Sequence, residues 1–245
     1  MSDRFQVLLA YDGTEFFGSQ YQTELRTVQG ELEKALTKIG WKEKTVLFAG
    51  RTDAGVHAAG QVVAFDLKWD HPEIELNRAM NAVLPHDISA VKVQRIRHDF
   101  HPRYDAVSRK YHYQILTNPV RDPLQERYYW RVWPEVNVTL MENASRVLLG
   151  THDFGALGKA HQPGGSTIRE ILDTAWMQDG NKLGFVIEGN AFLYHMVRRI
   201  VMVLVQIGQG KEPVDTISKY LENSSGEHAQ GLAPANGLSL IEVRY

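Results

Sequence analysis

The sequence predicts an α/β protein (α+β) of two similar halves, each with a mostly antiparallel or mixed sheet covered by helices on one face. Short runs rich in β-branched and aromatic residues alternate with helix-period patterns along the whole chain. The order of elements in the second half resembles that in the first, although no residue-level repeat is present. No low-complexity tract or long linker separates them. We expect halves at residues 1–105 and 106–245, meeting to form a central cleft.

The first half contains two helices whose limits follow from their capping residues. Thr27 is the expected N-cap of a helix that ends at Gly40, a residue type common just after a helix C-terminus. A second helix over residues 75–84 is stopped by Pro85. Four strand-like runs complete this half: residues 5–10, 45–49, 61–65 and 89–95.

The second half carries the clearest turn signal, Asp-Gly-Asn at 179–181, which predicts a hairpin between residues 171–177 and 183–188. A helix over 140–149 is ended by a glycine, and a long apolar helix is expected over 190–207. Residues 155–167, with four glycines and a proline, are interpreted as a mobile loop. The remaining predicted strands are residues 110–117, 128–133 and 238–243.

Composition indicates an ordinary folded protein. The chain has 245 residues, 43% of them hydrophobic and 23% charged, which is enough to bury a substantial core. Cysteine is absent, so disulfides and thiolate metal sites are excluded. The N-terminus lacks a signal-peptide pattern, and the longest apolar stretch, 200–205, is too short to span a bilayer. We therefore expect a cytoplasmic protein with no membrane partner.

The chain has 27 Lys and Arg and 29 Asp and Glu, so its net charge is only −2. The overall charge therefore does not indicate a nucleic-acid partner, and the distribution of basic residues along the chain is more informative. Residues 92–112 hold six basic and two acidic side chains, with histidines and aromatic residues interleaved. Phosphate neutralisation together with base stacking is what single-stranded RNA recognition requires. This segment is the candidate RNA footprint, and a solvated charged face is the alternative.

One carboxylate lies in a Gly- and Thr-rich loop between two predicted strands. Asp53 sits within the run from Gly50 to Gly60, where glycines permit tight turns and close approach of another molecule. Arg51, two residues earlier, is a cation placed to keep the carboxylate ionised. Such a loop is typical of a presented nucleophile, although an Asp in a Gly-rich loop also commonly forms a turn through its own side chain.

Several motifs carry a resemblance to a known family. The run Gly-Arg-Thr-Asp-Ala-Gly-Val-His from Gly50, with Gln61 beyond it, resembles the signature of the TruA family of tRNA pseudouridine synthases. Residues 11–18 with Gln20, residues 27–33 and residues 192–198 resemble further motifs of that family. The resemblance covers nearly the whole chain, in order.

The resemblance implies a function and a site. It implies a fold whose two halves share a continuous sheet, and an enzyme that isomerises uridine to pseudouridine in the anticodon stem-loop of tRNA, at family positions 38, 39 and 40. Asp53 would be the nucleophile, Arg198 its ion-pair partner, and Tyr111 the aromatic ring that stacks on the target base and assists proton removal. The reaction needs no cofactor, because nothing is oxidised and no group is transferred from outside. The partners implied are tRNA and a second copy of the chain in a homodimer.

Other assignments concern RNA and the departures from the family pattern. Five side chains are expected to contact RNA: Arg103, Arg109, Lys110, His57 and Arg169. The usual Gly-Trp-Gln is Gly-Ser-Gln here, with Ser19 in place of the tryptophan, and Met202 and Leu232 replace a Gly and a Thr. A surface arginine is the alternative for Arg198, and Arg199 fits that alternative better.

Three competing interpretations use other residues. His98 and His101 form a His-x-x-His pair, but no third ligand is evident, so no metal site is assigned. Residues 10–14 echo the Asp-x-Asp-Gly-Thr motif of aspartyl-phosphate phosphatases, yet position 10 is alanine where that chemistry needs its nucleophile. An RNA-binding protein without turnover is the third, and the joint presence of Asp53, Tyr111 and Arg198 argues against it.

Overall fold

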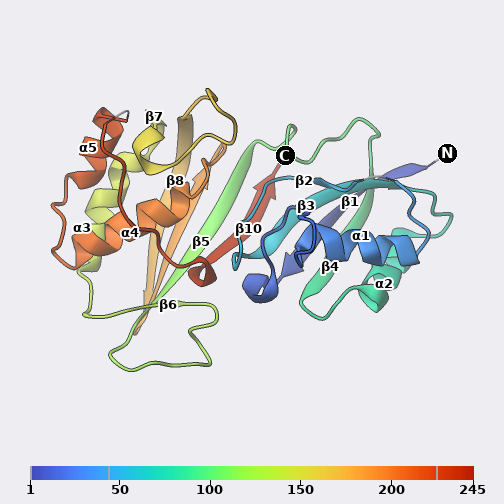
Figure 1. The fold of residues 1–245 in the computed structure, drawn as a ribbon, viewed down its shortest axis with the longest axis horizontal. Helices are drawn as coiled ribbons and strands as arrows, with labels where there is room; N and C mark the ends of the chain where they lie inside the picture. The colour runs from blue at the N-terminus through green and yellow to red at the C-terminus, as the bar shows by residue number, and fades with distance from the viewer. Residues whose placement is uncertain (1, 44, 225) are drawn as a thin grey trace. The chain divides into compact units, whose positions relative to one another are not determined.

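The computed structural model describes residues 2–43, 45–224 and 226–245. Within these residues, ten strands, most of them paired antiparallel, and five α-helices make a mixed α/β protein, as the sequence predicts. The chain forms two compact units, which Figure 1 allows the reader to follow by colour. Unit 1 contains the residues up to Val107 together with Ser239–Tyr245, and unit 2 contains Ser108–Leu238.

Unit 1 is a sheet with strand order β4-β1-β3-β10, and β2 adds to β3. All pairings in this unit are antiparallel except that of β10 with β3, which is parallel and places Ser239 beside His57. The elements of this unit are β1 (Asp3–Tyr11), α1 (Val28–Lys38), β2 (Leu47–Phe48), β3 (His57–Leu67), α2 (Glu73–Val83), β4 (Ile88–Ile96) and β10 (Leu238–Arg244).

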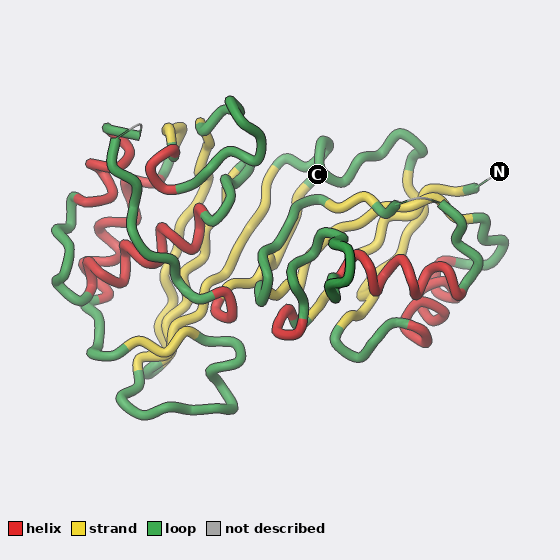
Figure 2. The backbone as a smooth tube through the Cα atoms, viewed as in Figure 1, coloured by secondary structure: helices red, strands yellow, loops and turns green. Residues whose placement is uncertain are grey.

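The core of unit 1 follows from alternation along β1, where every second residue is buried. Phe5, Val7 and Leu9 are completely buried and, by alternation, lie on one face of the strand. Helices α1 and α2 pack along this sheet (Figure 2). The Thr27 hydroxyl caps α1 by accepting a hydrogen bond from the Gly30 N–H, and Gly40 adopts φ +98° after the helix. The capping residues read from the sequence are therefore confirmed.

Unit 2 is a sheet with strand order β5-β9-β8-β7, and β6 pairs parallel with β5. Helices α3, α4 and α5 contact one another and form a layer on this sheet. The elements are β5 (Ser108–Thr117), β6 (Trp130–Val132), α3 (Val138–Ser145), β7 (Gly150–Asp153), β8 (Ile168–Asp179), β9 (Lys182–Gly189), α4 (Met196–Gly208) and α5 (Thr216–Glu222).

Large side chains on the helix-facing side of β5, β9 and β8 fill the core of unit 2. Tyr113 on β5 lies beside Phe185 on β9, which packs against Trp176 with ring centroids 4.8 Å apart. The Trp176 indole N–H donates to the Ser145 hydroxyl at 3.2 Å, so the sheet and α3 are also joined by a hydrogen bond. The hairpin predicted at 179–181 is confirmed, with Gly180 at φ +57°.

The structure corrects several element limits. The predicted helix over 190–207 begins only at Met196, because His195 adopts a left-handed conformation with φ +64° and the residues before it are not helical. The predicted strand over 45–49 is reduced to two residues, and β3 begins earlier than expected. Strand β7 and helix α5 were not predicted. Across the described part of the chain, none of the helices has the length and apolar character needed to cross a membrane.

Candidate active site

The loop that carries Asp53 joins β2 to β3 in unit 1. Asp53 is half-buried, and its neighbour Thr52 is buried. Gly55 has φ +77°, a conformation that favours glycine, and its N–H donates to the Phe16 carbonyl at 3.2 Å. The Asp53 carbonyl accepts from the Val56 N–H at 3.2 Å. The loop is therefore a tight turn immediately before β3.

Thr52 is held at three of its polar groups. Its N–H donates to the Ser19 hydroxyl at 2.8 Å, and its carbonyl accepts from the Ser19 N–H at 3.0 Å. Its hydroxyl lies 2.8 Å from the Tyr11 hydroxyl at the end of β1. The residue before Asp53 is thus fixed to two other segments of unit 1.

A buried polar network supports the start of the same loop. The amide nitrogen of Gln61, on β3, donates to the Gly50 carbonyl at 3.0 Å and lies 3.4 Å from the Tyr11 hydroxyl. Gln61 is fully buried, and burial raises the pKa of Tyr11 to about 12. The Tyr11 hydroxyl therefore stays protonated and available for hydrogen bonding throughout the physiological pH range.

His57, which the sequence suggested as an RNA contact, is buried at the start of β3. Its Nδ1 accepts from the Gly13 N–H at 3.0 Å and lies 3.2 Å from a carboxylate oxygen of Asp12. Gly13 runs so close to the strand that a Cβ there would lie 2.0 Å from the Val56 carbonyl oxygen. The geometry gives His57 a structural environment that does not favour contact with RNA.

Arg51 is exposed and, in the part of the chain that the structure describes, makes no ion pair. The supporting role that the sequence suggested for it therefore has no side-chain contact behind it.

Arg198 lies in the first turn of α4 in unit 2. No side chain caps this helix; its N-cap residue is His195, whose ring stacks on Tyr194 with centroids 3.7 Å apart. Two backbone hydrogen bonds join Tyr194 to Lys159, at 2.9 and 3.2 Å. At Gly158 a Cβ would lie 2.5 Å from the Cβ of Leu193. The glycine-rich loop that we interpreted as mobile is therefore attached at this point to the segment leading into α4.

The Arg198 guanidinium points to the segment before β10. Its Nε donates to the Ala233 carbonyl at 2.7 Å, and the Tyr113 hydroxyl donates to the next carbonyl, that of Pro234, at 2.7 Å. Burial raises the pKa of Tyr113, and the positive charge of Arg198 offsets part of that effect. Tyr113 is thus a core residue, and the Nε of Arg198 anchors the guanidinium to the segment before β10.

Tyr111 lies on the same face of β5 as Tyr113 and is also buried. Its ring meets Phe192 edge to face with centroids 5.1 Å apart, so it adjoins the segment that leads to α4. Lys110, by alternation, lies on the opposite face of β5, where its Nζ is 3.0 Å from a carboxylate oxygen of the buried Glu188. The side chains of Tyr111 and Lys110 therefore lie on opposite faces of the sheet.

The structure pairs several cations of the basic segment with carboxylates. Arg95 bridges Asp3 and Glu73. Arg97 is paired with Asp99 and, at short range, with Asp105. The local positive excess read from the sequence is therefore partly neutralised within the fold.

Of three other predicted RNA contacts, one is exposed and two are half-buried within their own units. Arg103 is exposed, with its guanidinium 6.0 Å from the centroid of the exposed Tyr104 ring. Arg109 donates to the Asn190 carbonyl at 2.9 Å. Arg169 donates to the Ser166 carbonyl at 3.0 Å, and partial burial lowers its pKa.

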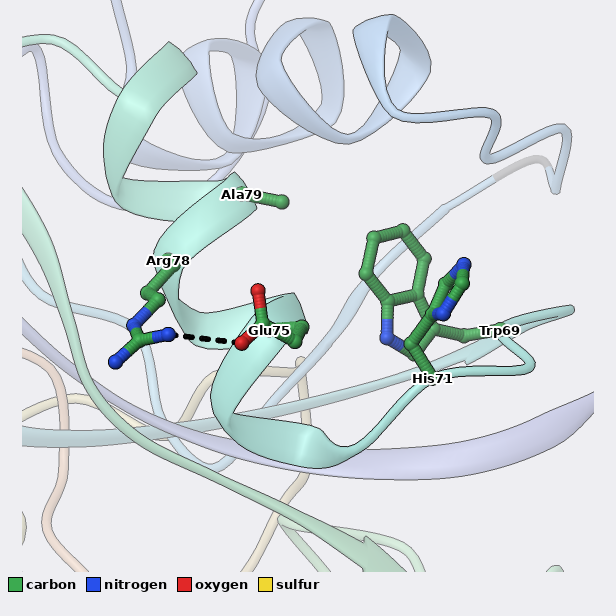
Figure 3. Close-up of a pocket in the computed structure, with 5 residues that line it drawn as sticks. All are labelled: Trp69, His71, Glu75, Arg78 and Ala79. Atoms are coloured by element: carbon green, nitrogen blue, oxygen red, sulfur yellow. Dashed lines mark hydrogen bonds and ion pairs between the residues drawn. The ribbon is translucent and has the colours of Figure 1, made fainter.

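A shallow groove of about 580 Å³ lies beside the start of α2 and is lined by Trp69, His71, Glu75, Arg78 and Ala79 (Figure 3). Two of these lining residues form an ion pair with each other: a guanidinium nitrogen of Arg78 lies 2.8 Å from a carboxylate oxygen of Glu75. None of the predicted site residues lines this groove. Within the described residues, no cluster of three His, Asp or Glu side chains could hold a metal ion, and His101 Nδ1 accepts from the Arg103 N–H.

Sequence reasoning missed the residues that support the Asp53 loop. Ser19 appeared only as a departure from a family pattern, although it is 1% exposed and bonded twice to Thr52. Because Ser19 and Thr52 are 33 residues apart, no local sequence signal indicated this contact.

Comparison with known proteins agrees with this arrangement of motifs. A family described as tRNA pseudouridine synthase matches residues 8–105 and 144–245, ranges that include Asp53 and Arg198. The tRNA pseudouridine synthase A of Leuconostoc mesenteroides is 38% identical, with 99% of each chain covered. That of Fervidobacterium nodosum is 41% identical, again over 99% of each chain, and that of Halalkalibacterium halodurans is 41% identical over 96% of this chain and 90% of its own. This chain belongs to the tRNA pseudouridine synthase family.

Proposed function

We propose that this protein converts uridine to pseudouridine in the anticodon stem-loop of tRNA, at positions 38, 39 and 40, with Asp53 as the nucleophile. The observation that carries the proposal is the family match, which includes Asp53 on a tightly supported loop. Relatives named tRNA pseudouridine synthase A align with the chain over almost their whole length.

The reaction is an isomerisation that conserves every atom of the nucleotide. The bond from ribose C1′ to uracil N1 breaks, the ring turns, and a new bond joins C1′ to C5. The proton on C5 is lost and N1 gains one, so no oxidant or donor group enters. An ionised Asp53 carboxylate supplies the nucleophile, at C1′ or at the pyrimidine ring, and is released when C5 rejoins the ribose.

Two residues of unit 2 complete the proposed chemistry. Arg198 would pair with the Asp53 carboxylate and keep it ionised, because a nearby cation favours the charged form. Tyr111 would stack on the extruded base and assist removal of the C5 proton. Support comes from the position of Arg198 in the first turn of α4 and from the Phe192 contact that holds the Tyr111 ring beside the same segment.

RNA binding is assigned to three arginines that are exposed or partly exposed within their units. Arg103 and Arg109 belong to the basic segment, and Arg169 lies at the start of β8. We omit His57 because it is buried, and Lys110 because it is paired with Glu188. We also place the enzyme in the cytoplasm and infer a homodimer, both on family resemblance.

Incubation of the purified protein with unmodified tRNA, followed by mapping of pseudouridine at single-nucleotide resolution, tests the function. We expect product at positions 38–40 in the tRNAs that carry uridine there. Binding should weaken steeply between low and moderate salt, since phosphate contacts release counterions. Absence of pseudouridine in every tRNA tried would overturn the proposal. Binding that does not depend on salt would overturn only the assignment of these arginines to RNA contact.

A further inference from the structure

Ser19 links the first helix of unit 1 to the loop that carries Asp53. Its carbonyl accepts from the Gln29 N–H at 2.9 Å, in the first turn of α1. Its N–H and its hydroxyl both bond to Thr52, at 3.0 and 2.8 Å. A single buried residue therefore connects a helix to the residue before the proposed nucleophile.

The two bonds to Thr52 act on two successive peptide planes. Because a peptide group is planar, a hydrogen bond to its N–H or its carbonyl orients the whole unit. The Ser19 hydroxyl holds the peptide between residues 51 and 52, and the Ser19 N–H holds the peptide between Thr52 and Asp53. Once both planes are set, the backbone of Asp53, from which its side chain projects, is fixed by the Thr52–Asp53 peptide and by the turn that follows.

Close packing keeps this arrangement in place. Gly18 has φ +95°, and a Cβ there would lie 2.9 Å from the Thr52 carbonyl oxygen. The Thr52 hydroxyl is held on its other side by Tyr11 at 2.8 Å. Thr52 therefore has little freedom to shift, and the Ser19 hydroxyl is the side chain that bonds its backbone N–H.

We propose that Ser19 is a positioning residue for Asp53: its hydroxyl orients the loop so that the carboxylate is aimed at the uridine. This role rests on the proposed function. The family pattern would place tryptophan at this position, and its indole has no acceptor for the Thr52 N–H. The positioning role is therefore specific to the serine of this chain and is not part of the family pattern.

The test compares Ser19→Ala with the wild-type protein in single-turnover reactions on unmodified tRNA, with enzyme in excess. Loss of the hydroxyl leaves the buried Thr52 N–H without its partner and lets the loop move. We expect the rate of pseudouridine formation to fall about tenfold, because small misplacements of reacting groups are costly. The dissociation constant for tRNA should stay within about twofold, since Ser19 is buried.

Two further variants separate positioning from packing and from general stability. Ser19→Cys keeps the volume but has a weak acceptor, so its rate should fall between those of wild type and Ser19→Ala. Ser145→Ala removes a buried hydroxyl in unit 2 that accepts from the Trp176 indole. It should lower the melting temperature to a similar degree and leave the rate unchanged. Hydrogen exchange of the peptide covering residues 50–56 should quicken in Ser19→Ala and not in Ser145→Ala.

Each other outcome has a defined meaning. A Ser19→Ala rate within twofold of wild type would overturn the positioning role while leaving the proposed function intact. If Ser19→Cys reacts as fast as wild type while Ser19→Ala is slow, the loss in Ser19→Ala is due to packing. That result would also overturn the positioning role. Should Ser19→Ala fail to fold, the volume-preserving cysteine variant decides. A wild-type protein that forms no pseudouridine would remove both proposals together.

Discussion

The Asp53 loop of unit 1 and the Arg198 segment of unit 2 are supported in different ways. The loop is fixed by side chains of a buried polar network, those of Ser19, Tyr11 and Gln61. In the Arg198 segment, the N-cap residue His195 makes no side-chain cap hydrogen bond to the helix, and backbone hydrogen bonds and the left-handed turn at His195 help to hold the chain. The guanidinium itself donates to a main-chain carbonyl.

The difference matches what each group is proposed to do. A nucleophile must be held within a fraction of an ångström of its productive geometry, which directional hydrogen bonds provide. A stabilising cation acts through its charge, so a long side chain hydrogen-bonded to a main-chain carbonyl tolerates looser placement. The comparison therefore predicts that unit 1 is sensitive to loss of single hydroxyls and that unit 2 is sensitive to loss of charge.

The largest effect is expected at the nucleophile itself. Asp53→Asn removes the charge with almost no change in shape, and turnover should fall on the order of 10³-fold or more. The rate is measured on unmodified tRNA, with binding measured separately. Asp70→Asn, at an exposed carboxylate of the same unit, is the matched control and should behave like wild type. Full turnover in Asp53→Asn would show that another group is the nucleophile.

The next effect tests the charge in unit 2. Arg198→Met keeps the aliphatic length and removes the cation, and we expect turnover to fall about 100-fold. Arg199→Met, one residue further along α4, is the comparison and should retain most of the activity. Equal losses in the two variants would argue that the helix, rather than the Arg198 charge, is what matters.

A matched pair of tyrosine variants compares the two units directly. Tyr11→Phe removes the partner of Thr52 and of Gln61, whereas Tyr113→Phe removes a donor to the Pro234 carbonyl. Each should lower the free energy of unfolding by about 1–3 kcal/mol, measured by urea denaturation. Only Tyr11→Phe should also slow single-turnover catalysis. A larger catalytic loss in Tyr113→Phe would reverse the contrast drawn between the units.

The smallest effect concerns the left-handed residues. His195→Gly relieves an unfavourable backbone conformation but loses the ring stacked on Tyr194, so stability should change by less than about 1 kcal/mol. Gly55→Ala, at φ +77°, introduces strain with no gain and should cost about 1 kcal/mol. Denaturation midpoints of the two variants provide the measurement, and a stabilised Gly55→Ala protein would contradict the turn geometry.

Local signals predicted the elements of unit 1 well. The Thr27 cap and Gly40 define α1, and β1 follows from a short apolar run at residues 5–10. These features depend on residues close in sequence. The limits of β2 and β3 were less accurate, because they are decided by pairing between strands.

The errors in unit 2 come from contacts between distant residues. The apolar pattern before Met196 indicates helix, yet the close approach at Gly158 and the Lys159–Tyr194 pairing keep those residues extended. Strand β7, Gly-Thr-His-Asp, lacks apolar alternation and is defined only by its partner β8. For the site, the Asp53 loop was visible in the sequence, but its support by Ser19 spans 33 residues and has no local signature.

The parallel pairing of β10 with β3 has a consequence for how the protein is made. Gly60 lies so close to this last strand that a Cβ would be 2.2 Å from the Ile241 carbonyl oxygen. During translation, the whole Asp53 loop leaves the ribosome long before residues 238–244 exist. A nascent chain that has not yet reached β10 therefore holds β3 with only residues 63–64 of this edge paired, by β2, and unit 1 closes once residues 238–244 have been synthesised.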